Sequence, residues 1–270
     1  MTTEELIAAR RAEPWREALR KSKKNKERTD IPRVEMNELD AEYRSHTRLE
    51  EVNLGLTKEQ AMQEAQRCLD CPNPTCMQGC PVSINIPTFV KNIERGEFLE
   101  AARVLKETSA LPAVCGRVCP QEKQCESKCI HLKMGKPAVA IGYLERFAAD
   151  YERESGNISI PEVAEKNGIK IAVVGSGPAG LSFAGDMAKR GYDVTVFEAL
   201  HEIGGVLKYG IPEFRLPNKI VDVEIEGLRK MGVKFMTNCI VGKTISYDDL
   251  HADGFKGIFA ASGAGLPNFM

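Results

Sequence analysis

Two closely spaced groups of cysteines constrain this chain more than any other feature. Eight of its nine cysteines lie between residues 68 and 129. The first group reads Cys-x2-Cys-x4-Cys-x3-Cys-Pro and comprises Cys68, Cys71, Cys76 and Cys80. The second reads Cys-x3-Cys-Pro-x4-Cys-x3-Cys and comprises Cys115, Cys119, Cys125 and Cys129. Each group carries enough thiolates to bind a polynuclear metal centre, and this spacing indicates one.

Composition excludes several classes of protein. The chain has 270 residues, 43% of them hydrophobic, and a formal net charge of -1, which argues against attraction of the whole protein to nucleic acid. No apolar run has the length of a signal peptide or of the roughly 18 residues that span a membrane. We therefore expect a cytoplasmic protein with no membrane partner, in which dense cysteines are metal ligands rather than disulfides.

The sequence divides into three parts. Residues 1–50 form a charged arm, whose basic run from Arg20 to Arg28 is predicted to be a solvated helix face rather than a docking surface. Residues 51–165 have helical periodicity: Thr57-Lys-Glu-Gln60 is a capping box, Pro87 starts a further helix, and another follows at Phe98. Residues 166–270 begin a nucleotide-binding unit. The predicted class is therefore α+β and multidomain, with a helical metal domain followed by an α/β Rossmann-like domain.

The third part opens with a β-α-β pattern. The expected elements are a strand over 169–174, a helix over 178–190 and a strand over 193–198. The intervening glycines have separate functions: Gly175 allows the tight turn, Gly177 lets backbone approach a pyrophosphate, and Gly180 lets the helix pack closely. Pro178 and Ala179 start the helix, whose free amide groups and dipole favour the phosphates.

An acid at the end of the second strand restricts the nucleotide. Glu198 can accept hydrogen bonds from a ribose diol and would repel a 2′-phosphate, so FAD or NAD is favoured over NADP. Gly204 and Gly205, with the following segment that contains Arg215, would let backbone approach a large flat ring. The alternative for this segment is an ordinary surface turn.

These motifs together closely resemble the NAD(P)H-oxidising small (beta) subunit of glutamate synthase. The resemblance is carried by the two cysteine groups, Gly175-Ser-Gly-Pro-Ala-Gly180 with Glu198, Ile211-Pro-Glu-Phe-Arg-Leu-Pro217 and Pro14-Trp15-Arg16. It extends over essentially the whole chain. The N-terminal half of dihydropyrimidine dehydrogenase and the large subunit of NADH-dependent ferredoxin:NADP oxidoreductase share the same module.

The resemblance implies two [4Fe-4S] clusters whose ligands interleave. One cluster would take Cys68, Cys71, Cys76 and Cys129, and the other would take Cys80, Cys119, Cys125 and Glu145. Cys115 would then be a nearby thiol without iron. Spacing alone also permits four-plus-four grouping, and structural zinc is a further alternative. Cys239 is expected to be an unreactive core thiol on a strand.

The resemblance also implies a function. A hydride carries two electrons and an iron-sulfur cluster accepts one, so FAD would stand between NAD(P)H and the clusters. The electrons would reach a large glutamate synthase subunit, in a hetero-oligomer, that makes glutamate from glutamine and 2-oxoglutarate. The alternatives are a subunit of an NAD(P)H:ferredoxin-type oxidoreductase, whose partner would be a related redox flavoprotein, and a non-enzymatic iron-sulfur or zinc scaffold. No catalytic side chain is assigned.

One departure from the family leads to a further expectation. Family members carry a second dinucleotide-binding domain for NAD(P)H, whereas this sequence has one glycine fingerprint. We therefore expect the NAD(P)H site to lie outside this chain, the FAD domain to be incomplete, and the polypeptide to be truncated at its C-terminus.

Overall fold

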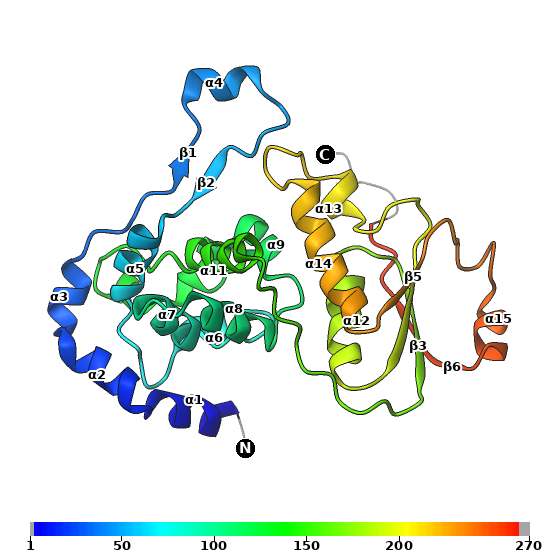
Figure 1. Ribbon diagram of the computed structural model, residues 1–270, viewed down its shortest axis with the longest axis horizontal. Coiled ribbons are helices and arrows are strands. Elements are labelled where there is room, and N and C mark those ends of the chain that lie inside the picture. The colour runs from blue at the N-terminus through cyan, green and yellow to red at the C-terminus, as the bar shows by residue number, and fades with distance from the viewer. Residues whose placement is uncertain (1–2, 265–270) are drawn as a thin grey trace. The chain divides into compact units, whose positions relative to one another are not determined.

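The computed structural model describes residues 3–264, which form two compact units (Figure 1). Residues 3–46 and 52–159 belong to the first unit, and residues 47–51 and 160–264 belong to the second. The residues of the predicted arm thus share a unit with the cysteine-bearing helices. No helix in the described part of the chain is long and apolar enough to span a bilayer.

The first unit is built mainly from short helices. Its N-terminal segment contains α1 (Thr3–Arg11), α2 (Pro14–Ser22), α3 (Asn25–Asp30) and α4 (Ala41–His46), with β1 (Asn37–Glu38) antiparallel to β2 (Asn53–Gly55). The remaining helices are α5 (Lys58–Gln66), α6 (Thr75–Gln78), α7 (Ile86–Glu94), α8 (Phe98–Lys106), α9 (Pro112–Val118), α10 (Ile130–Lys133) and α11 (Ile141–Ser155). Two 3₁₀ turns, 121–123 and 126–128, lie between α9 and α10.

Local sequence determines where the central helices begin. The predicted capping box is confirmed at α5, where the Thr57 hydroxyl accepts from the backbone N–H of Gln60 and the Gln60 side chain accepts from that of Thr57. At α7 the Asn85 side chain caps the helix, and Pro87 occupies its first turn. The long helix α11 ends at Gly156, which has a φ of 73°.

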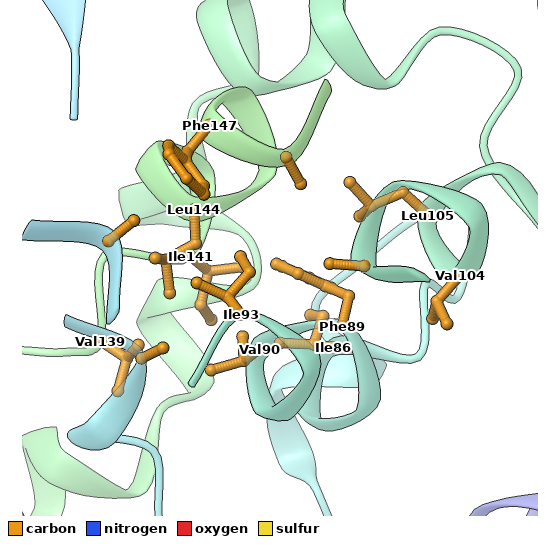
Figure 2. Close-up of a cluster of buried hydrophobic side chains, with 14 of the residues drawn as sticks. Ile86, Phe89, Val90, Ile93, Val104, Leu105, Val139, Ile141, Leu144 and Phe147 are labelled. Carbon is orange, nitrogen blue, oxygen red and sulfur yellow. The ribbon is translucent and has the colours of Figure 1, made fainter. Parts of the chain in front are cut away.

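The core of the first unit lies where α11 meets the earlier helices. Figure 2 shows Phe89 and Ile93 of α7 and Ile141 and Leu144 of α11 directed into this core, all of them at most 3% exposed. Phe98 of α8 adds an edge-to-face contact with Phe147 at 5.0 Å between ring centroids. These contacts hold α11 against the scaffold that carries the cysteines.

Two arginines of the basic run do not lie on the solvated helix face that its charge pattern predicts, whereas Lys21, Lys24 and Lys26 are exposed as predicted. Arg20 pairs with the buried carboxylate of Asp70 at 2.7 Å. Arg28, only 1% exposed, pairs with Glu94 at 2.8 Å. The prediction was wrong for these residues because their partners are distant in sequence, and a charge run does not reveal which of its members meet a buried acid.

The second unit contains a parallel sheet with strand order β5-β4-β3-β6. Its strands are β3 (Lys170–Val174), β4 (Asp193–Phe197), β5 (Lys234–Met236) and β6 (Phe255–Ala260), and its helices are α12 (Pro178–Lys189), α13 (Val206–Tyr209), α14 (Asn218–Lys230) and α15 (Tyr247–Ala252). The predicted β-α-β unit is therefore confirmed as β3-α12-β4. Central β3 has β4 on one side and β6 on the other, so the glycine loop after β3 lies at a topological switch point.

Cys239 does not lie on a strand, contrary to expectation. β5 ends at Met236, and Cys239 follows in a loop where its half-buried sulfur accepts a hydrogen bond from the Thr244 hydroxyl at 3.7 Å. Short apolar runs of this kind do not by themselves locate the end of an edge strand.

Candidate iron-sulfur and nucleotide sites

Three cysteines of the first sequence group and one of the second share one pocket of the first unit. These cysteines are Cys68, Cys71, Cys76 and Cys129. The pocket encloses about 420 Å³ of empty space, its open mouth included. Apolar side chains from α7 and from the segment before α11 form much of its wall, among them Ile86, Val90 and Val139. The arrangement brings together the first ligand set that the resemblance implies.

Burial disfavours the charged thiolate form of the cysteines in the first set. It raises the pKa of Cys68 to about 11, although Lys91 and the backbone N–H of Asp70 act in the opposite direction. Burial likewise raises the pKa of Cys76 well above its ordinary value, with neighbouring thiols adding to the effect. A bound cation is the kind of charge that would deprotonate such thiols. All nine cysteines are free of disulfides.

A buried histidine also lines this pocket, and sequence reasoning missed it. His131 is fully buried, and its Nε2 donates to the carbonyl oxygen of Arg67 at 3.0 Å, since a carbonyl can only accept. Its Nδ1 is buried without a hydrogen-bond partner. The only sequence signal was its position two residues after Cys129.

Residues of the second predicted set affect one another electrostatically. Burial is the main reason that the pKa of Cys125 rises to about 12 and that of Cys80 also rises, and the Glu145 carboxylate adds to both effects. Backbone N–H groups of Val82 and Ile84 donate to the Cys80 sulfur. Glu145 is itself only 5% exposed, so water screens its effect on these thiols little.

Cys115 and Cys119 form a hydrogen-bonded pair beside Glu145. The hydrogen bond from Cys115 lowers the pKa of Cys119 to about 7, and the same bond, with burial, raises that of Cys115. The two residues are one helical turn apart, with the Cys119 N–H donating to the Cys115 carbonyl at 3.1 Å. In residues 3–264, no group of three or more His, Cys, Asp or Glu side chains is arranged to hold a single metal ion.

Two glycines allow α9 and α11 to approach closely enough for this geometry. A Cβ on Gly116 would lie 2.5 Å from the backbone nitrogen of Arg146, and one on Gly142 would lie 2.2 Å from the Gln121 side chain. Gly116 follows Cys115 on α9, and Arg146 follows Glu145 on α11. The close contact therefore holds α11, which carries Glu145, against the helix that carries Cys115.

Replacing Gly116 with alanine is expected to destabilise the chain by about 1–3 kcal/mol, because the new methyl group would push against backbone that cannot rotate away. The iron content should fall in the second site while the first site is retained. Gly227→Ala is the matched control, since a Cβ there meets nothing within 4 Å and should stabilise helix α14 by roughly 0.5–1 kcal/mol. Thermal unfolding and iron analysis of both variants check the prediction.

The glycine loop after β3 has the geometry expected of a phosphate-binding turn. Gly175 has a φ of 102°, and a Cβ there would lie 2.3 Å from the carbonyl oxygen of Ala261, just after β6. A Cβ on Gly180 would lie 2.0 Å from the carbonyl oxygen of Gly175, so only glycine lets α12 pack this closely. A Cβ on Gly177 would meet nothing within 4 Å, so this side of the loop has room for a ligand at the start of α12.

Glu198 lies directly after β4 and is tied to this loop. It is 6% exposed and accepts hydrogen bonds from the backbone N–H and hydroxyl of Ser176 and from the N–H of Leu200. The Ser176 hydroxyl in turn accepts from the N–H of Gly204 at 3.0 Å. A Cβ on Gly205 would lie 2.8 Å from the Cα of Gly177, so the second glycine pair packs against the first loop.

The remaining predicted residues are more open. Pro178 and Ala179, the first two residues of α12, are exposed. Arg215 is exposed on the turn before α14, where its N–H donates to the carbonyl of Pro212 at 2.9 Å. Whether these residues contact a nucleotide stays a prediction.

Comparison with known proteins agrees with this arrangement. Residues 44–157 match the family described as dihydropyrimidine dehydrogenase domain II, 4Fe-4S cluster, and residues 173–231 match the NAD(P)-binding Rossmann-like domain family. The chain is 39% identical over 224 residues to the NAD-dependent dihydropyrimidine dehydrogenase subunit PreT of Escherichia coli K12, covering 82% of this chain and 54% of that protein. The chain is a homologue of these iron-sulfur and NAD(P)-binding oxidoreductase subunits.

Glutamate synthase small chains are relatives of similar closeness. Identity to the Glutamate synthase [NADPH] small chain of Escherichia coli K12 is 39% over 205 residues, covering 76% of this chain and 43% of that one. The corresponding chain of Azospirillum brasilense is 35% identical over 200 residues, covering 74% and 42%. The predicted resemblance and fold class are confirmed. The chain spans about half the length of these relatives.

Proposed function

We propose that this chain is an electron-transfer flavoprotein subunit that carries electrons from NAD(P)H, through FAD and two [4Fe-4S] clusters, to a partner subunit. One observation supports this most directly: a pocket lined by Cys68, Cys71, Cys76 and Cys129 occurs in the same chain as a phosphate-binding glycine loop.

The two cysteine-rich regions would each hold one cluster. The residues fit this group because their thiols are buried or half-buried, disulfide-free and supplied with backbone N–H donors, as at Cys68 and Cys80. Cys80, Cys119 and Cys125 would complete the second site with Glu145, whose carboxylate donates charge differently from a thiolate. When bound, the clusters would supply one-electron transfer.

The glycine loop would hold the FAD. Gly175, Gly177 and Gly180 shape a turn whose free N–H groups would receive the pyrophosphate at the start of α12. Glu198 lies at the end of β4, where its carboxylate would accept from a ribose hydroxyl and disfavour a 2′-phosphate. The chain would bind and orient the FAD, so that two electrons taken up together can pass one at a time to the clusters.

We propose a glutamate synthase large subunit as the electron acceptor, in a complex that makes glutamate from glutamine and 2-oxoglutarate. The identity to glutamate synthase small chains supports this partner. A second candidate is favoured by the longer match to PreT, 224 residues against 205 at the same 39% identity: a partner that acts on dihydropyrimidines. Electron transfer measured with each partner separates the two candidates.

Anaerobic purification with iron, sulfide and flavin analysis tests the cofactor assignment. About eight irons per chain are expected from two four-iron centres, together with flavin and with low-temperature EPR signals after dithionite reduction. A colourless protein that holds zinc in place of iron would contradict the proposal and support a scaffold function.

A further inference from the structure

The loop that carries Cys68 and Cys71 is surrounded by basic side chains. We call residues 66–71 the first cysteine loop. Three of its carbonyl oxygens accept from cationic groups: that of Gln66 from Arg28 at 2.7 Å, that of Cys68 from Lys91 at 2.6 Å, and that of Asp70 from Arg11 at 2.9 Å. Cationic side chains thus bind alternate carbonyl groups of the loop that carries two proposed ligands.

Buried carboxylates in this region do not cancel that charge. Asp70, between the two ligands, is fully buried and pairs with both Arg16 at 2.5 Å and Arg20 at 2.7 Å. Glu94 likewise pairs with both Lys91 at 2.5 Å and Arg28 at 2.8 Å. Each carboxylate is shared by two cations, so each group keeps a net positive charge. Lys91 and Arg16 are at most 1% exposed, so water screens them little.

Most of these cations come from the N-terminal arm. Arg11, Arg16, Arg20 and Arg28 belong to α1, α2 and α3, whereas the match to the iron-sulfur family begins at residue 44. Helices α1, α2 and α3 therefore lie outside the matched iron-sulfur domain, and yet their arginines contact the loop that carries two of its cysteines. The other cysteine region also has cations, Arg33 paired with Glu126 at 2.8 Å and Arg117 and Arg146 paired with Asp150, but the carboxylates of Glu126 and Glu145 both act on Cys125 there.

We propose that the arm arginines, together with Lys91, make the cluster site of Cys68, Cys71, Cys76 and Cys129 the more easily reduced of the two. Reduction adds one negative charge, which buried cations stabilise and a buried carboxylate opposes. One electron would then leave the site containing Glu145 and join the site beside the arm, with no proton or other group transferred. This inference rests on the proposed cluster ligation.

The experiment measures reduction potentials in charge-removing variants of the holoprotein. Arg11→Gln and Arg20→Gln each remove a cation from a partly exposed side chain, so water can replace the lost donor. Each variant should lower the reduction potential of the first cluster by about 59 mV. For a one-electron couple this shifts the electron distribution about tenfold toward the second cluster. Arg20→Lys keeps the charge and should restore the wild-type midpoint. The EPR signal of the first cluster is identified as the one lost in Cys129→Ser.

Arg10→Gln is the matched control. Arg10 lies on the same arm, but it pairs with Glu107 at 2.7 Å, after the end of α8, and should leave both midpoints unchanged. Unchanged midpoints in Arg11→Gln and Arg20→Gln, with both four-iron signals intact, would overturn the inference and leave the proposed function standing. A wild-type holoprotein with no four-iron signal would instead overturn the proposed function.

Discussion

Replacing Cys129 with serine is expected to lower the iron content from about eight to about four atoms per chain, with loss of one EPR signal. The physical reason is that Cys129 lines the same pocket as Cys68, Cys71 and Cys76, although it belongs to the second cysteine group in sequence. Each of the four thiolates supplies a bond and a negative charge to a four-iron centre. Without one of them the cluster is held too weakly to be retained. Iron analysis and EPR of anaerobically purified protein measure the effect.

Double variants distinguish interleaved ligation from four-plus-four grouping. With interleaved ligands, Cys68→Ser combined with Cys129→Ser should still leave about four irons, because both substitutions affect one cluster. Cys68→Ser combined with Cys80→Ser should remove nearly all iron. Four-plus-four grouping predicts the reverse for both pairs. Cys239→Ser is the control and should retain about eight irons, since Cys239 lies outside both cysteine regions.

Replacing Glu64 with alanine is expected to destabilise the chain by about 3–5 kcal/mol, a fall in Tm of roughly 10 °C. Glu64 is fully buried and pairs with Arg67 at 2.5 Å, and Arg67 is itself only 1% exposed. Its carboxylate also accepts from the backbone N–H of Val34 at 2.8 Å and of Ala140 at 2.7 Å. Its removal would leave a buried guanidinium and two buried donors without their acceptor.

The chain offers a closely matched comparison for this variant. Glu100 and Arg103 also lie three residues apart on a helix, at the same 2.5 Å, but their side chains are 32% and 56% exposed. Glu100→Ala should therefore change stability by no more than about 1 kcal/mol, because solvent screens an exposed pair. Similar melting temperatures for the two variants would show that burial does not determine the contribution of such pairs here.

Much of the fold was predictable from local pattern. The capping box at Thr57 and the β-α-β unit around Gly175 both depend on neighbours in sequence, and both formed as expected. The prediction was wrong for two arginines of the arm, because their contacts are with residues that are distant in sequence. Arg20 and Arg28 have buried carboxylate partners that lie 50 and 66 residues away, and no periodicity in the arm indicates them.

The amino-acid sequence by itself indicated metal binding and nucleotide binding. Cysteine spacing and a glycine fingerprint between two strands are properties of short segments, so they can be recognised without the fold. Only the tertiary structure decided which groups share a site. Cys129 lies beside Cys68 because the helices fold the two cysteine groups together, and Glu145 acts electrostatically on Cys80 and Cys125 from α11, which Gly116 lets approach α9. Close packing of helices depends on all their neighbours at once, so no single segment encodes it.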